Sequence, residues 1–528
     1  MEEVLERESK WEVDEVFSLP ALDNLVSDSR IETTSVELTS IYFDTPERDL
    51  LAHNLTLRRR EGADESGWQL KVPHPNGRTE LHAPLSEELP PEFVEVVTGA
   101  ALGKPLHAVT TIHTLRNRHR VLGPDGELIV EVDDDMVDTT PADGSSVAWH
   151  EIEVELGPRI DAVPEALVDS LAEAGARRSE FPTKLSHVLP AQPRPVTDTA
   201  AERAIYEYMT AQIDMIFAGD VALRRGQEPI HDTRVATRRL RSTLRVFGKL
   251  LDRSAIGAVE DELKWYAGLL GDVRDCHVQH RRLADQVHKL PPELVLGPVA
   301  ARIDATILAR QVPSRNALTE AMDSTRYLEL LATLHAWQSH PPFDRRLRTR
   351  ELVKRARKAA RKADHRLATA LHDQRQASLH RARKAAKRAR YAAELLEPAG
   401  KHPRAKPNIK YYKKIQSVLG DYNDGIVSSQ FLWRTATTAG TAAGENGFTF
   451  GRAPSAHPSD NAQRIANKGE RPAGPHRDFP GVRGDRRFEY RSVDRWRSKR
   501  LRESGRPKPG SPNEVGGGQM GTRAKGCW

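Results

Sequence analysis

The chain of 528 residues has few cysteines, few aromatic side chains and no long apolar run. Its two cysteines, Cys276 and Cys527, are too few for a disulfide framework and indicate a reducing compartment. No stretch of about 18 apolar residues could form a membrane-spanning helix, and the opening "MEEVLERESK" has no apolar segment resembling a secretory signal. These absences predict a cytoplasmic protein.

Charge is divided unevenly along the chain, although the formal net charge is only +6. Residues 1–190 hold 17 Lys and Arg against 38 Asp and Glu, a balance of −21. The remaining residues hold 63 basic against 36 acidic side chains, a balance of +27. An acidic first part suits metal ions, and a basic second part suits a polyanion.

Periodicity and composition divide the chain into four parts. Residues 1–190 contain short alternating segments separated by Gly, Pro and Asp turns, which predicts an α+β domain dominated by antiparallel strands. Residues 191–198 form a Pro-rich linker, and residues 199–450 have a helical period. Residues 451–528 are rich in Arg, Gly and Pro without a period, so we expect this tail to be disordered.

Several predicted strands carry charge along one face. In "ERESK" the alternation of a strand places Glu6, Glu8 and Lys10 on the same side. The same alternation aligns Arg58 with Arg60, Gln69 with Lys71, Arg116 with Arg118 and Arg120, Glu131 with Asp133, and Glu151 with Glu153 and Glu155.

A single charged strand face usually contacts solvent, but the signs here are segregated. The first and late strands supply carboxylates, whereas the middle strands supply guanidinium and ammonium groups. Mg²⁺ prefers oxygen ligands, and the arginine fork fits phosphate geometry. A sheet that turned both sets inward would hold a complex of a triphosphate with a metal ion.

The order of these motifs resembles the CYTH domain, whose members are the triphosphate tunnel metalloenzymes. The resemblance covers about residues 3–190 and rests on the Glu6-x-Glu8-x-Lys10 motif, "YFDT" at 42–45, the "LRRR" strand, "HEIEVEL" and Lys184. It implies an antiparallel eight-stranded β-tunnel. Family members hydrolyse inorganic triphosphate, thiamine triphosphate or related tripolyphosphates with Mg²⁺ or Mn²⁺, and some make cyclic AMP.

The resemblance also implies roles for the charged residues. Glutamates of the first and late strands would bind the metal, and basic side chains would bind the phosphates. The implied metal ligands are Glu6, Glu8, Glu153 and Glu155, joined by Asp133 or Glu151. The implied phosphate contacts are Lys10, Arg58, Arg60, Lys71, Arg116, Arg118 and Lys184. The implied catalytic group is Lys10 with Glu6, Glu8, Glu151, Glu153 and Glu155; which glutamate orients the water is left open.

The helical part contains a repeated basic stripe. From residue 231, "HDTRVATRRLRSTLRVF" places a histidine and four arginines on one helix face by steps of three and four, opposite an apolar face. "HRARKAAKRARYAAELL" repeats the arrangement from residue 380. Each stripe precedes a second motif, "LLGDVRD" at 269–275 and "VLGDYND" at 418–424. The preserved spacing predicts two pseudo-symmetric helical bundles.

These stripes contain almost no acids, although a solvated helix normally intersperses them. A polyanion is therefore the natural partner. The duplicated motif resembles the CHAD domain over about residues 199–450, which implies a helical fold that binds inorganic polyphosphate. The implied contacts are His231, Arg234, Arg238, Arg239, Arg241, Arg245, His380, Arg383, Lys384, Lys387, Arg388 and Tyr391.

One departure from that family concerns the end of the chain. A CHAD domain would continue past "GENGFTFG" into a closing helix, whereas this chain turns into the Arg/Gly/Pro tail. The departure puts the last helix in question and leaves both basic stripes intact.

Together the two parts predict metal-dependent hydrolysis of inorganic triphosphate or a short polyphosphate, coupled to binding of inorganic polyphosphate. Such a protein would be cytoplasmic and associated with polyphosphate granules. The alternatives are a polyphosphate-binding protein without activity, or a nucleic-acid binder. The stripes lack interleaved aromatic residues for base stacking, which counts against the last. The preferred substrate and the oligomeric state are left open.

Overall fold

The structure is a computed structural model. It describes residues 2–23, 25, 28–62, 65–140, 146–189, 195–398, 403–441 and 446–452. The predicted disorder of the tail concerns residues that, from 453 onward, lie outside this description, as do residues 191–194 of the predicted linker.

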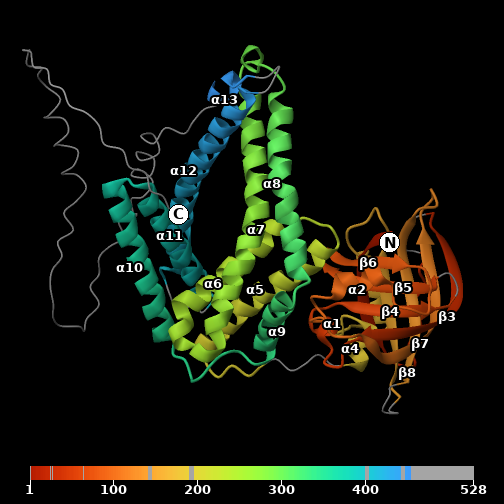
Figure 1. Ribbon diagram of the computed structural model, residues 1–528. Coiled ribbons are helices and arrows are strands. Elements are labelled where there is room, and N and C mark those ends of the chain that lie inside the picture. Colours follow the sequence, from red (N-terminus) through yellow and green to blue (C-terminus); the bar gives the residue numbers. More distant parts are fainter. Residues whose placement is uncertain are drawn as a thin grey trace, which may run out of the picture. The chain divides into compact units, whose positions relative to one another are not determined.

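The first domain is built on one antiparallel sheet, as the alternating segments predict (Figure 1). Its strands are ordered β1-β6-β5-β4-β3-β7-β8-β9-β2-β10. Their bounds are β1 Glu2–Glu6, β2 Glu8–Val13, β3 Arg30–Asp44, β4 Thr56–Glu61, β5 Gly67–His74, β6 Gly77–Ala83, β7 His107–Leu122, β8 Leu128–Thr140, β9 Ala148–Leu156 and β10 Arg177–Arg178.

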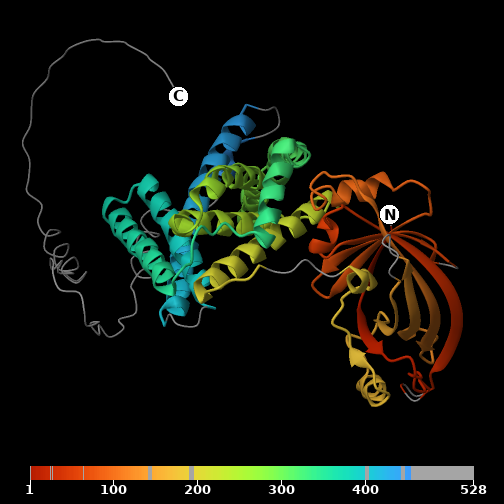
Figure 2. The same cartoon turned by 90° about the horizontal axis from the view of Figure 1, so that it is seen from below.

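The first strand closes this sheet on itself. It breaks at Arg7, so that β1 pairs with β6 while β2 pairs with β9 at the other end of the strand order. At this break Gly77 has φ 139° and lies so close to the Glu6 carbonyl that a Cβ would clash with it. Figure 2 shows the strands curving round as a result.

The strand number differs from the eight expected. The structure has ten strands, because the break at Arg7 divides the first strand in two and the two-residue β10 joins β2. The antiparallel class and the closure agree with the prediction.

The alternating apolar positions of the late strands face outward and are covered by a helix. Val132 of β8 and Ile152 of β9 are fully buried in one cluster with Leu167 and Leu171 of α3. Since side chains alternate, this burial turns the charged positions of β8 and β9 to the inside. The helices of this domain are α1 Asp49–Ala52, α2 Pro91–Val97, α3 Glu165–Glu173 and α4 Lys184–Val188.

The second domain consists of helices, among which α7 and α8 form a long packed pair (Figure 1). Their bounds are α5 Ala200–Arg224, α6 Ile230–Phe247, α7 Arg253–His288, α8 Val299–Met322, α9 Thr325–Ser339, α10 Thr349–Asp373, α11 Gln376–Leu396, α12 Ala405–Ala439 and α13 Phe448–Arg452, with 3₁₀ turns at Gly248–Leu250 and Pro292–Leu294. Within the described ranges, no helix combines the length and apolar character needed to cross a membrane.

The two basic stripes lie on α6 and α11. The opposite faces are buried, with Leu240 and Phe247 of α6 in one core and Ala385 and Ala389 of α11 in another. Each stripe helix packs against the long helix that follows it in sequence, α6 against α7 and α11 against α12. The helical repeat is therefore a structural repeat, with basic faces left outside both cores.

Candidate functional site

The interior of the first domain contains a charged cavity of ≈190 Å³. Nearly all of the residues predicted for the tunnel line it. These are Glu6, Glu8, Lys10, Arg58, Arg60, Lys71, Arg116, Arg118, Asp133, Glu153, Glu155 and Lys184. The remaining one, Glu151, is buried beside the cavity and contacts Lys184 at 2.7 Å.

Strand register arranges many of these side chains in three rows across neighbouring strands, with facing Cβ atoms roughly 5 Å apart. The first row has three adjacent carboxylates on β2, β9 and β8, which form the carboxylate row, and it ends at an arginine on β7; the other two rows also contain charges of both signs. The first row is Glu8, Glu155, Glu131 and Arg120; the second is Lys10, Glu153, Asp133 and Arg118; the third includes Glu151, Asp135 and Arg116.

Glu155 is the member of the carboxylate row without an ion-pair partner among the described residues, whereas Glu8 contacts Lys10 at 3.6 Å and Glu131 contacts Arg118 at 2.9 Å. Burial, together with the neighbouring Glu6, Glu131 and Glu8 carboxylates, raises the pKa of Glu155 to about 8, and Lys71 offsets part of this rise. Glu6 is buried and its Oε1 accepts from Lys71 at 2.5 Å, but its Oε2 has no hydrogen-bond partner among the described residues. Carboxylate oxygens, one of them unpartnered, are the ligands that a hard divalent cation prefers.

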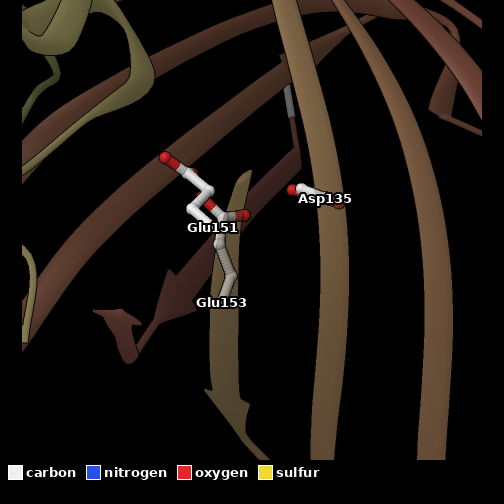
Figure 3. Close-up of side chains that lie close together, drawn as sticks. All are labelled: Asp135, Glu151 and Glu153. Atoms are coloured by element: carbon white, nitrogen blue, oxygen red, sulfur yellow. The ribbon is translucent and has the colours of Figure 1, made fainter. Parts of the chain in front are cut away.

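A second acidic cluster is tighter but is already neutralised. Oxygens of Asp135 on β8 and of Glu151 and Glu153 on β9 lie within 4.8 Å of one another (Figure 3). The Lys184 ammonium contacts all three, at 2.8, 2.7 and 2.7 Å. Although burial disfavours the charged form, Arg116 and Lys184 hold the pKa of Asp135 well below its usual range. This cluster therefore has an internal counterion, which Glu155 of the carboxylate row lacks among the described residues.

Arg116 organises the acidic side of the cavity. Its guanidinium makes a bidentate pair with Asp135, at 2.8 and 2.7 Å, and also contacts Asp133 at 2.5 Å and Glu153 at 2.8 Å. It is buried, with 6% exposure. Asp133, the least compensated of these carboxyls, has its pKa raised to about 6, chiefly by burial.

The cations that line the cavity from β4 and β5 are Arg58, Arg60 and Lys71, and Lys71 donates to Glu6 at 2.5 Å. Arg58 donates to Gln69 Oε1 at 2.6 Å and reaches Glu80 only at 3.4 Å. Arg60 donates to Ser40 and contacts Glu65. Burial and the neighbouring Arg58 lower the pKa of Arg60 to about 10, which indicates an excess of positive charge. This region would be stabilised by an anion.

Sequence reasoning missed three carboxylates at this site. Asp135 shares strand parity with Asp133, so the alternation that singled out Asp133 could have found it. Glu80 faces Lys71 across β5 and β6, a pairing that requires the strand register. Glu65 lies between β4 and β5 and contacts Arg60, Arg116 and Arg118, and no periodic signal marks such a position.

The helical domain contains a groove of ≈850 Å³ formed by α6, α7, α11 and α12. Thirteen Lys and Arg side chains line it, against two acids, Asp275 and Asp424. Burial and the nearby Arg238, Arg383 and Arg234 lower the pKa of Lys387 to about 6. The groove therefore concentrates positive charge to the point where one lysine loses its proton near neutral pH.

Of the twelve residues predicted to bind polyphosphate, all except Arg239 line this groove. Arg239 follows Arg238 by one residue, which rotates it about 100° round the helix, and it contacts Glu394 at 3.2 Å. Lining residues that the sequence argument did not select are Lys264, Arg274 and Arg282 of α7. Arg390 of α11, which continues the second stripe by the same steps, and Lys413 of α12 also line the groove.

The fold and the two sites define a protein that joins a charged tunnel to a basic helical domain. Comparison with family models finds a CYTH domain at residues 5–186 and a CHAD domain at residues 207–433. The uncharacterized protein Rv2226 of Mycobacterium tuberculosis is 32% identical over 483 residues, which cover 85% of this chain and 91% of the relative. The chain therefore belongs to the same family as this relative, with a CYTH domain followed by a CHAD domain.

Two solved structures are similar to single domains of the chain. The CHAD domain from the plant Ricinus communis has a TM-score of 0.41 and 23% identity, covering 52% of this chain and 94% of its own. A putative adenylyl cyclase from Hippeastrum, described as having a dominant triphosphatase activity, has a TM-score of 0.20 and 20% identity, covering 34% of this chain and 94% of its own.

Proposed function

We propose that the tunnel domain is a divalent-metal-dependent triphosphatase acting on inorganic triphosphate or a short polyphosphate, and that the helical domain binds inorganic polyphosphate. The observation that carries the proposal is the separation of charge inside one cavity. The carboxylate row lines the cavity from β2, β9 and β8, and Arg58 and Arg60 line it from β4. A triphosphate with its metal ion carries the charges that complement both sides.

The donor set fits Mg²⁺ or Mn²⁺ held by Glu6, Glu8 and Glu155, with Glu153 as a further ligand. When bound, such an ion would withdraw charge from the phosphoryl group and lower the pKa of a coordinated water. Glu131, which completes the carboxylate row in the structure, adds negative charge that draws the cation to this side of the cavity.

The basic side chains would position the substrate. Arg58 and Arg60 would bind phosphate oxygens and hold the chain of phosphates in line with an attacking water. Lys10 and Lys184, at the acidic side, would offset charge that develops as the phosphoryl group transfers. Phosphoryl transfer needs positioning and charge compensation more than a strong base, and this cavity supplies both.

We expect the purified protein to release phosphate from inorganic triphosphate only when Mg²⁺ or Mn²⁺ is present. The Glu6→Gln/Glu8→Gln variant should be slower by about 100-fold or more, because two carboxylates at the metal side are lost. Glu2→Gln, on the exposed face of β1, is the matched control and should retain the wild-type rate. Phosphate release is measured over a panel of triphosphates. If the wild type released phosphate no faster than the double variant, the protein would bind polyphosphate without hydrolysing triphosphate.

A second expectation concerns metal binding without turnover. Mn²⁺ should raise the melting temperature of the wild type, because a cation relieves the repulsion among Glu6, Glu8 and Glu155. Glu155→Gln should melt higher than the wild type in the metal-free buffer and should gain less from Mn²⁺. Thermal unfolding with and without Mn²⁺ tests this, with Glu2→Gln again as control. If Mn²⁺ shifted Glu155→Gln as much as the wild type, the carboxylate row would not be the metal site.

For the helical domain, the groove supports a polyanion as ligand. Its lining contains thirteen basic and two acidic side chains, and the described residues that line it include a single aromatic ring, Tyr391. That composition suits a repeating phosphate chain better than nucleic-acid bases, which are usually bound by stacking on aromatic side chains.

A further inference from the structure

The second repeated motif, "LGD" followed three residues later by Asp, has no role in the proposal so far. Its glycines are Gly271 in α7 and Gly420 in α12, both buried inside long helices. Glycine in a helix interior is unfavourable relative to alanine. Its presence at equivalent positions of both repeats therefore requires a local reason.

The reason is a guanidinium group lying against each glycine. A Cβ added to Gly271 would lie 3.0, 3.2 and 3.5 Å from Nη2, Nε and Cζ of Arg234. A Cβ added to Gly420 would lie 3.1, 3.6 and 3.7 Å from Nη2, Cζ and Nε of Arg383. In both cases Nη2 is the nearest atom and Cζ lies about 0.5 Å farther away, so each guanidinium approaches the glycine with a nitrogen-bearing edge and not with its flat face. A methyl group there would force the arginine away by a few tenths of an ångström.

Both arginines belong to the basic groove and both are short of partners. Arg234 and Arg383 line the groove, and the Nε of each is buried without a hydrogen-bond partner within the described part of the chain. Arg234 reaches Asp275 only at 3.9 Å. A guanidinium held by one edge, with the side chain still partly exposed as that of Arg234 is, keeps its outer donors for phosphate oxygens.

The two arrangements are copies of one another and adjoin. Arg234 and Arg383 are separated by 149 residues, as are Gly271 and Gly420. The charge of Arg383 acts on Arg234 and that of Asp424 acts on Asp275, so the two copies meet in the same groove.

We infer that Gly271 and Gly420 are positioning residues of the anion site, each leaving the space that holds Arg234 or Arg383, so that the groove contains two equivalent phosphate-binding half-sites. The inference rests on the proposed binding of polyphosphate. It assigns the second motif to the same ligand as the basic stripe, which explains why the spacing between the two motifs is preserved in both repeats.

The test uses the full chain and size-fractionated inorganic polyphosphate as the probe. Gly271→Ala and Gly420→Ala should each weaken binding about fivefold, and the double variant about 25-fold, because displaced guanidinium groups lose charge-assisted hydrogen bonds. Gly268→Ala is the matched control, since it lies in α7 and a Cβ there meets no atom within 4 Å. None of the three substitutions should lower the melting temperature, because alanine favours a helix.

A variant that already lacks Arg234 distinguishes a positioning role of Gly271 from a purely structural one. In Arg234→Ala, adding Gly271→Ala should cause no further loss of affinity, because the arginine that the glycine positions is absent. A further loss there, a fall in melting temperature that accompanies the loss, or equal affinities of Gly271→Ala, Gly420→Ala and Gly268→Ala would overturn the inference. A wild type that does not retain polyphosphate at all would instead overturn the proposed function of the helical domain.

Discussion

Replacing Arg116 by methionine is expected to destabilise the tunnel domain by about 3–5 kcal/mol, because it leaves buried carboxylates without their cation. Arg116 contacts Asp133, Asp135 and Glu153, and Asp135 is fully buried. Among the described residues, Lys184 would remain as the only cationic partner of Asp135. Methionine conserves much of the side-chain volume, so the loss would report charge rather than a cavity.

The measurement is urea unfolding of the full chain, with hydrogen exchange of the β7 and β8 amides to confirm that the tunnel domain is the part affected. Arg118→Met is the matched control on the same strand. Arg118 is more exposed, with 19% side-chain exposure against 7% for Arg116, so solvent can compensate its partners and the loss should be smaller. If Arg116→Met were as stable as the wild type, Asp133, Asp135 and Glu153 would be stabilised by shared protons and not by the charge of Arg116.

Binding of polyphosphate is expected to weaken steeply as the pH rises from 7 to 9, because of Lys387. In the free protein, burial and the charges of Arg238, Arg383 and Arg234 lower the pKa of this lysine to about 6, with Asp424 offsetting part of the effect. A bound polyanion favours the protonated form and returns the pKa toward its ordinary value of about 10.4. Binding therefore takes up a proton, and the affinity should fall by up to about tenfold per pH unit in this window.

Without ligand, the folding stability changes with pH in the opposite direction to the affinity. A lysine whose pKa is lower in the folded than in the unfolded chain binds fewer protons when folded, so its contribution to stability rises with pH between about 6 and 10.4. His231 and His380 also line the groove, but their pKa values are lowered by burial from 6.5, so both are neutral across the window.

Titration calorimetry in buffers of different ionisation enthalpy would count the protons taken up. Lys387→Arg should bind polyphosphate with little dependence on pH between 7 and 9, because arginine keeps its charge there. Lys387→Met should bind more weakly at pH 7 and should also lose the pH dependence. If the affinity of Lys387→Arg for polyphosphate fell with pH as steeply as that of the wild type, another group would take up the proton.

The sequence predicts the environment of a residue where that environment depends only on the residue's own strand or helix. Strand parity placed Arg58, Arg60, Glu153 and Glu155 on one surface, and the structure finds all four around one cavity. Helical steps of three and four did the same for the basic stripes. Where helical phase or strand parity was not followed, the prediction is less accurate: Arg239 contacts Glu394 and does not line the groove, and Asp135 is left out although it shares parity with Asp133.

The sequence by itself determined the α+β class, the alternation that turns charge inward and the two basic stripes, because each depends on a period of two or 3.6 residues within one element. Only the tertiary structure decided which charges compensate one another. Lys184 comes from a helix after the last long strand and neutralises Asp135, Glu151 and Glu153, whereas Glu155 is left among carboxylates. Compensation depends on distances between elements that are remote in sequence, and no local period encodes those distances.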